Sequence, residues 1–167
     1  MAFANLKVRQ AGLHDVDIVL GILDEAAGWL KQREIPSVWK PGGFSGQSFL
    51  AQISHGEVYV ALVDDTAAGT FILQWSDSPF WGERPPDSGY IHKLAVRPDF
   101  AGRGIGREML RWAEARAKSA GKRFLRLNCL AGDRKIRDYY ERAGFTHRGD
   151  VVEPRGRASL YEKRLTD

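Results

Sequence analysis

The stretch that most constrains this chain runs from Leu94 to Leu110, where a short apolar segment ends at Pro98 and a glycine-rich turn leads into a helix. Glycine lets a backbone turn tightly and approach a ligand closely, because no Cβ stands in the way. Three glycines lie in this turn, at Gly102, Gly104 and Gly106. The apolar residues that follow keep helical spacing, at Ile105, Met109, Trp112 and Ala113.

The start of this helix is suited to bind an anion. The first N–H groups of a helix have no intrahelical partner, and the helix dipole adds partial positive charge at the same end. A phosphate or pyrophosphate group satisfies both. Arg103 and Arg107 add full positive charges there. The sequence therefore predicts a phosphate-bearing ligand at this turn.

Other glycine-rich phosphate motifs fit the stretch poorly. A P-loop requires G-x-x-x-x-G-K-[ST], and the chain contains no Gly-Lys-Ser or Gly-Lys-Thr sequence. A dinucleotide fingerprint requires G-x-G-x-x-G after the first strand, whereas the spacing here is G-x-G-x-G and the turn lies past mid-chain. The remaining alternative is a glycine turn that binds nothing, and the interleaved arginines argue against it.

Hydrophobic periodicity predicts alternating strands and helices around this turn. We expect strands over 6–9, 58–63, 69–75, 90–96, 124–129, 145–152 and 158–164. We expect helices over 16–30, 47–53, 105–120 and 134–143, with Asp15 and Asp133 as N-caps of the first and the last. Segments 31–46 and 76–88 contain several glycines or prolines and are expected to be irregular. An α/β fold with a mixed sheet follows.

Two motifs resemble the GNAT superfamily of acyl-CoA-dependent N-acetyltransferases. The family signature [R/Q]-x-x-G-x-[G/A] is similar to residues 101–106, with Ala101 in place of the usual Arg or Gln. The family's Y-x-x-x-G-F motif is similar to the stretch from Tyr140 to Phe145. The Asn that commonly stands seven residues before that tyrosine is Asp133 here. The resemblance covers about 90–145, the expected cofactor-binding core of a single domain spanning 1–167.

The resemblance implies the family's fold and cofactor. The fold would be a central, mostly antiparallel sheet of six to seven strands, splayed at the acyl-CoA site and flanked by helices. The cofactor would be acetyl-CoA, its pyrophosphate held mainly by backbone N–H groups and its pantetheine amides by backbone groups of Leu94 and Val96. No metal site is expected. The implied cofactor-binding residues are Leu94, Ala95, Val96, Ala101, Gly102, Arg103, Gly104, Ile105, Gly106, Arg107 and Asp133.

Tyr140 holds the position that protonates the departing sulfur in the family. A phenol with an ordinary pKa near 10 keeps its proton at neutral pH, as a general acid must. The alternative is that Tyr140 only packs in the core, because the neighbouring Tyr139 has the same chemistry. The motif favours Tyr140.

His92 is the candidate general base, since an imidazole can take a proton at neutral pH. It stands two residues before Leu94 on the expected strand, so strand alternation would place its side chain on the face of Leu94 and Val96. The stretch is similar to the H-x-L-A-V sequence of serotonin N-acetyltransferase. The alternatives are a histidine that only packs, with Glu25, Glu83 or Asp87 as the base.

Aromatic residues in the irregular segments are candidates for the substrate site, namely Trp39, Phe80 and Trp81. The expected reaction is direct transfer of an acetyl group from acetyl-CoA to a primary amine of a small molecule. Two alternatives stay open: acetylation of a macromolecular amine (a protein N-terminus, a lysine or an aminoacyl-RNA) and a non-catalytic acyl-CoA sensor. Dimers are common in the family, but no homodimer interface can be identified in the sequence.

Composition is compatible with this interpretation. The chain has 167 residues, 43% of them hydrophobic, enough for one core. Its single cysteine, Cys129, excludes an intramolecular disulfide and favours a cytoplasmic protein with a buried, inert thiol. Neither a signal peptide nor a membrane-spanning segment is recognised in the sequence. A net charge of +4 is mild, so a nucleic-acid partner is secondary to an anionic cofactor.

Overall fold

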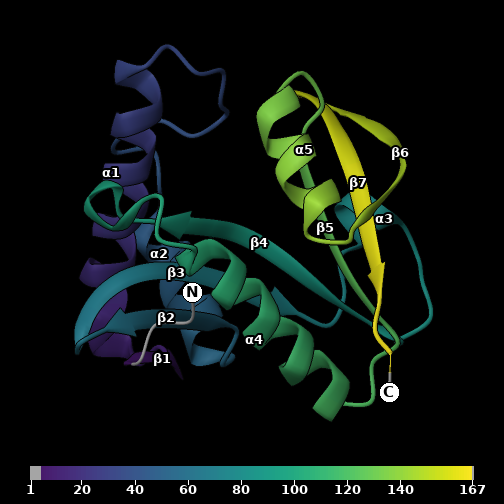
Figure 1. Cartoon of the computed structure of the whole chain (residues 1–167), viewed down its shortest axis with the longest axis horizontal. Coiled ribbons are helices and arrows are strands. Elements are labelled where there is room, and N and C mark those ends of the chain that lie inside the picture. The colour runs from purple at the N-terminus through teal and green to yellow at the C-terminus, as the bar shows by residue number, and fades with distance from the viewer. Residues whose placement is uncertain (1–4, 167) are drawn as a thin grey trace. The chain divides into compact units, whose positions relative to one another are not determined.

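The structure is a computed structural model that describes residues 5–166 (Figure 1). Its strands are β1 Leu6–Gln10, β2 Val58–Val63, β3 Thr66–Gln74, β4 Ser88–Val96, β5 Phe124–Leu130, β6 Thr146–Glu153 and β7 Gly156–Arg164. Its helices are α1 Val16–Gln32, α2 Gly46–Ser54, α3 Ser78–Trp81, α4 Ile105–Ser119 and α5 Arg134–Arg142, with short 3-10 turns η1 Leu13–Asp15 and η2 Pro98–Phe100. Every expected strand and helix is present.

The strands form one mixed seven-stranded sheet, hydrogen-bonded in the order β1-β2-β3-β4-β5-β7-β6. The pair β4–β5 is parallel, whereas β1–β2, β2–β3, β5–β7 and β6–β7 are antiparallel. The resemblance implied a mostly antiparallel sheet of six to seven strands, and this is confirmed with seven strands. The chain divides into two compact units. One holds the described residues up to Leu73 together with Lys93–Trp112, and the other holds Gln74–His92 together with the residues from Ala113 on.

The first unit has helices on both faces of its strands. Val58 and Val60 of β2 belong to a buried cluster with residues of α1 and α2. Between them Tyr59 points to the other face, where its ring lies 4.8 Å from that of Trp112 on α4. Successive side chains of a strand alternate between faces, so this strand is apolar on both and is buried along almost its whole length.

Strands β2 and β3 form an antiparallel hairpin that is joined by a tight turn. Asp64 and Asp65 have positive φ angles of 49° and 65°. Two consecutive residues with positive φ are typical of the type I′ turn, whose twist matches the two strands that it joins. Thr66 lies in β3, which therefore begins three residues before the expected Gly69.

The second unit is built on the antiparallel strands β5, β7 and β6. Helix α5 begins at Asp133, whose side chain accepts a hydrogen bond from the N–H of Ile136 at 3.2 Å, so the predicted N-cap is confirmed. After the helix the chain turns at Gly144, which has a φ of 97°. The Lys163 ammonium group donates to the carbonyl oxygen of Ala143 at 3.0 Å and to Glu114 at 2.6 Å, and so satisfies a carbonyl just past the helix C-terminus.

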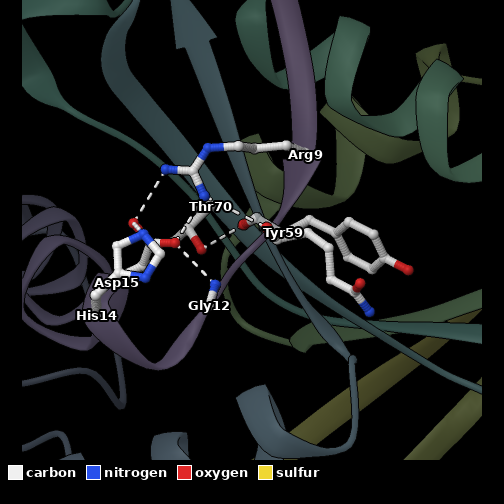
Figure 2. A network of polar contacts seen from close by, with 7 residues as sticks. Arg9, Gly12, His14, Asp15, Tyr59 and Thr70 are labelled. Carbon is white, nitrogen blue, oxygen red and sulfur yellow. Dashed lines mark hydrogen bonds and ion pairs between the residues drawn. The ribbon is translucent and has the colours of Figure 1, made fainter.

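Two local predictions were wrong. Segment 76–88 is not wholly irregular, because Ser78–Trp81 form the one-turn helix α3 with Pro79 in its first turn, where proline is tolerated. Asp15 precedes α1 but does not cap it with its side chain. Figure 2 shows its carboxylate turned back to the Arg9 guanidinium and to the N–H of Gly12. The Asp15 carboxylate therefore accepts hydrogen bonds from Arg9 and Gly12 rather than from the N–H groups of α1.

Candidate active site

The glycine turn lies in the first unit and leads directly into α4. Gly102 and Gly104 have φ angles of 76° and 79°, the left-handed region that side chains rarely adopt. The first backbone hydrogen bond into the helix runs from the N–H of Glu108 to the carbonyl of Gly104 at 3.1 Å. The N–H groups of Ile105, Gly106 and Arg107 precede it and have no acceptor within the helix. A Cβ added to Gly102 or Gly104 would meet nothing within 4 Å, so the turn is open above these residues.

The end of β4 reaches this turn with Leu94, Ala95 and Val96. Ala95 is buried in the core of the first unit, and Leu94 and Val96 are half-buried. The N–H of Arg97 donates to the carbonyl of Ala68 at 2.8 Å, which ties the end of β4 to β3.

Lys93, between His92 and Leu94, has a φ of 50°, a left-handed conformation that is uncommon for a non-glycine residue. Strand alternation assumes an extended backbone, so the expectation that His92 shares a face with Leu94 and Val96 stays a prediction. The sequence has no glycine here to signal this conformation.

The ladder between β4 and β5 is short. It pairs Ser88, Gly89 and Tyr90 with Phe124, Leu125 and Arg126, and ends there within the second unit. Ile91 and His92 lie beyond its end, whereas β5 stays paired to β7 over its whole length. The last residue of β4 paired to β5, Tyr90, therefore lies two residues before His92.

His92 is held by the segment that leads into α3. Its Nε2 lies 3.0 Å from Oδ2 of Asp77, whose side chain is 6% exposed. The ring of Phe80 packs beside the imidazole, with centroids 5.9 Å apart. The structure therefore brings together two residues proposed from the sequence, His92 and Phe80, and adds a buried carboxylate that the sequence analysis missed.

The sequence around Asp77 contains a feature that favours a helix start. Asp77 is followed by Ser78 and Pro79, and an acidic residue shortly before a proline is typical of a helix start. Three prolines lie in segment 76–88, and they favour an irregular chain over a helix. No local pattern could have paired Asp77 with His92, fifteen residues further along the chain.

Tyr140 lies near the end of α5 and is buried, whereas Tyr139 is only half-buried. Its ring packs against those of Phe145 and Tyr161, with centroids 6.0 Å and 6.4 Å away. Burial raises the pKa of the Tyr140 phenol, and the neighbouring Cys129 adds to the effect. The phenol therefore keeps its proton at neutral pH, as a general acid requires.

Cys129 lies on β5 close to Tyr140. Burial raises the pKa of its thiol to about 12, although the Arg137 guanidinium opposes the shift. A thiol of this kind stays protonated and is a poor nucleophile. Cys129 is half-buried rather than buried, and the raised pKa of its thiol agrees with the inert thiol expected from the sequence.

The aromatic candidates for the substrate site differ in their surroundings. Trp39 lies in the first unit, where it packs edge-on against Phe44 at 5.9 Å and against the core cluster. Trp81 is a core residue of the second unit, with the Arg126 guanidinium 4.9 Å from the centre of its ring. The expectation that Trp81 lines the substrate site is therefore corrected: it is buried among Tyr90 and Leu160. Phe80 is half-buried and remains a candidate.

The three alternative bases have other surroundings. Glu25 forms an ion pair with Arg97. Asp87 accepts a hydrogen bond from the hydroxyl of Ser88 at 2.9 Å. Glu83 is exposed. None of these contacts involves His92, whose imidazole lies beside the Asp77 carboxylate.

Comparisons with known proteins identify the family. Residues 24–145 match the model of the "Acetyltransferase (GNAT) family". The chain is 32% identical over 161 residues to the uncharacterized N-acetyltransferase YesJ of Bacillus subtilis, covering 91% of this chain and 86% of that protein. The chain belongs to the GNAT acetyltransferase family, as the two sequence motifs predicted, and is an N-acetyltransferase.

Solved structures show the same fold. A GNAT-family acetyltransferase from Listeria monocytogenes aligns with a TM-score of 0.81 at 26% identity, covering 96% of this chain and 95% of that one. The PaiA N-acetyltransferase of Thermoplasma acidophilum, solved in complex with coenzyme A, aligns with a TM-score of 0.75 at 19% identity, covering 96% and 99%. Among the described residues, no helix is both long and apolar enough to cross a membrane.

Proposed function

We propose that this protein transfers the acetyl group of acetyl-CoA directly to a primary amine of a small molecule. The observation that carries the proposal is the glycine turn, where Gly102 and Gly104 adopt left-handed conformations directly before α4. The first N–H groups of α4 have no acceptor within the helix, and a Cβ added to Gly102 or Gly104 would meet nothing within 4 Å. The coenzyme A complex of the Thermoplasma relative supports the same ligand class for this fold.

The residues at the turn fit a pyrophosphate. Backbone N–H groups of Ile105, Gly106 and Arg107 would donate to its oxygens, and Arg103 would add positive charge. Ala101 replaces the Arg or Gln of the family motif, so that position offers backbone groups only. Leu94 and Val96 would offer main-chain groups to the pantetheine amides. Asp133, whose carboxylate caps α5, is the remaining proposed cofactor contact.

The proposed chemistry needs two proton transfers. When bound, acetyl-CoA supplies a thioester whose carbonyl carbon accepts the amine nitrogen. His92 would take the proton that the amine loses as the carbon–nitrogen bond forms. Tyr140 would give its phenolic proton to the sulfur as the carbon–sulfur bond breaks. The N–H of Leu94 would donate to the carbonyl oxygen where negative charge develops.

A small amine is favoured by the surroundings of His92. The imidazole lies against the ring of Phe80, and an aromatic ring beside the base suits a compact apolar or cationic amine. A macromolecular amine is the second candidate. A protein N-terminus or lysine would need an extended surface beside His92 to hold the rest of the macromolecule. A sensor without turnover is the third candidate.

The cofactor assignment is tested with two matched glycine variants. Gly104→Ala and Gly121→Ala both place a Cβ at a left-handed residue, φ 79° and 76°, with nothing within 4 Å. Both should lose about 1 kcal/mol of stability. Calorimetry should show coenzyme A affinity reduced at least about tenfold in Gly104→Ala only, because only that Cβ projects over the turn. Equal affinities in both variants, or no binding heat with the parent protein, would contradict the proposal.

The activity and the substrate class are tested by thiol release. Acetyl-CoA is incubated with aliphatic diamines, arylethylamines, free amino acids and peptides with a free N-terminus. We expect free thiol to form fastest with a small amine. Turnover of the peptides alone favours the macromolecular alternative. Coenzyme A binding without turnover of any amine favours the sensor.

A further inference from the structure

The carboxylate of Asp77 is buried without serving the helix that it precedes. Asp77 occupies the N-cap position of α3, yet its side chain makes no capping hydrogen bond. The N–H groups of Phe80 and Trp81 donate instead to its main-chain carbonyl, at 3.3 Å and 2.9 Å. A buried carboxylate is costly unless a donor or a positive charge compensates for lost water. The nearest side-chain partner is His92, 3.0 Å away.

The imidazole of His92 is restrained on two sides by the same segment. Asp77 faces Nε2, and Phe80, three residues later, packs its ring beside the imidazole. The His92 side chain nevertheless remains 19% exposed, so part of its ring can be reached by a ligand. A short helical turn thus fixes both the position and the plane of the imidazole.

We propose that Asp77 is a positioning residue that holds His92 in the tautomer able to accept a proton at Nδ1. An ionised carboxylate only accepts hydrogen bonds, so the nitrogen that faces it must carry the proton. With the proton on Nε2, the neutral ring has its free lone pair at Nδ1. When Nδ1 takes a proton from the amine, the Asp77 carboxylate stabilises the imidazolium that forms. This inference rests on the proposed role of His92 as the base.

A second histidine–aspartate pair in the same unit supplies a matched control. Nε2 of His147 lies 2.8 Å from Oδ1 of Asp150, which also accepts a hydrogen bond from the hydroxyl of Ser159 at 2.7 Å. This pair is more exposed, with side chains 36% and 26% accessible. No step of the proposed reaction uses it. Asp77→Asn and Asp150→Asn therefore make the same chemical change at two histidines.

The first measurement needs no substrate. Long-range ¹H–¹⁵N NMR spectra of the protein above the titration range report the tautomer of each imidazole, and His92→Gln assigns the His92 signal. We expect His92 of the parent protein to carry its proton on Nε2. Asp77→Asn should give a mixture or the Nδ1–H form, because an amide can donate to Nε2 as well as accept. A parent spectrum with the proton on Nδ1 overturns the inference.

The second measurement is kinetic and uses the amine that the parent protein turns over fastest. Asp77→Asn should lower kcat about 100-fold with KM for both substrates changed less than about threefold. Asp150→Asn should change the His147 tautomer and leave kcat unchanged. Asp77→Asn with kcat within about threefold of the parent overturns this inference and leaves the proposed function standing. Absence of turnover by the parent protein contradicts the proposed function itself.

Discussion

Asp15 and Asp77 each stand directly before a helix, but their carboxylates contact different side chains. Each is a buried aspartate at the N-cap position of a helix, and neither caps that helix with its side chain. The Asp15 carboxylate, fully buried in the first unit, accepts two hydrogen bonds from Arg9, at 2.6 Å and 3.0 Å, and one from the N–H of Gly12 at 2.8 Å (Figure 2). The Asp77 carboxylate, in the second unit, faces the imidazole of His92.

The two carboxylates differ in whether the nearest partner side chain can change its charge near neutral pH. A guanidinium is always charged, so the pair of Asp15 with Arg9 is permanent and stabilises the fold; the exposed His14 lies farther from Asp15, at 3.6 Å. An imidazole gains and loses a proton near neutral pH, so a carboxylate beside it can influence a reaction. The nearest partner of Asp77 can therefore take part in the proposed proton transfer, whereas the nearest partner of Asp15 cannot.

The largest expected effect comes from replacing the two partners. His92→Gln removes the proton-accepting nitrogen but keeps an amide that can donate to Asp77. We expect kcat to fall about 10²- to 10⁴-fold with a nearly unchanged melting temperature. Arg9→Gln should do the opposite, costing about 2 kcal/mol of stability and leaving kcat of the folded protein unchanged. Thiol release and thermal unfolding measure the two effects, and a large loss of stability in His92→Gln would remove the contrast.

The next effect is the pH dependence of stability supplied by Asp15. The Arg9 guanidinium, the largest cause, lowers the pKa of Asp15 to about 2 from its ordinary value of 3.8. A carboxyl with a lowered folded-state pKa stabilises the fold above its unfolded-state pKa. That contribution, about 2 kcal/mol, is lost as pH falls from about 4 to about 2. Asp15→Asn should therefore be less stable than the parent protein by about 2 kcal/mol at neutral pH.

Urea unfolding of both proteins across this range provides the check. The difference between parent and Asp15→Asn should shrink as pH falls and should nearly vanish close to pH 2. Asp150 also has a lowered pKa, caused first by His147, but it is present in both proteins and cancels in the difference. A difference that stays constant from neutral pH to pH 2 would mean that charge on Asp15 is not the cause.

The smallest effect concerns Asp133, the aspartate that does cap its helix. Asp133→Ala removes the acceptor for the N–H of Ile136 and should cost about 1 kcal/mol of stability. Asp77→Asn should cost less, because no helix N–H depends on its side chain. Thermal unfolding of the two variants compares them directly. If Asp77→Asn is the less stable variant, Asp77 has a structural role larger than its contacts indicate.

Much of the fold and part of the site were predictable from local sequence. The glycine turn and the cap at Asp133 each depend on residues within one turn of the chain, and the same holds for the turn at Asp64 and Asp65, whose type only the structure showed. Short-range hydrogen bonds and backbone preferences decide such features, so residue type and spacing are sufficient to predict them. The family also followed from local motifs, because both lie within a strand-turn-helix or a single helix.

The remaining features depend on residues far apart in the chain. The sequence by itself determined the strands and the longer helices, the family and the choice of His92 and Tyr140 as candidates, but not the one-turn helix α3. Only the tertiary structure decided that Asp77 faces His92, that Trp81 is buried and that Lys93 adopts a left-handed conformation. Pairing, burial and such local backbone changes are set by competition among all the groups that packing brings near a residue, and that competition has no signature in the neighbouring sequence.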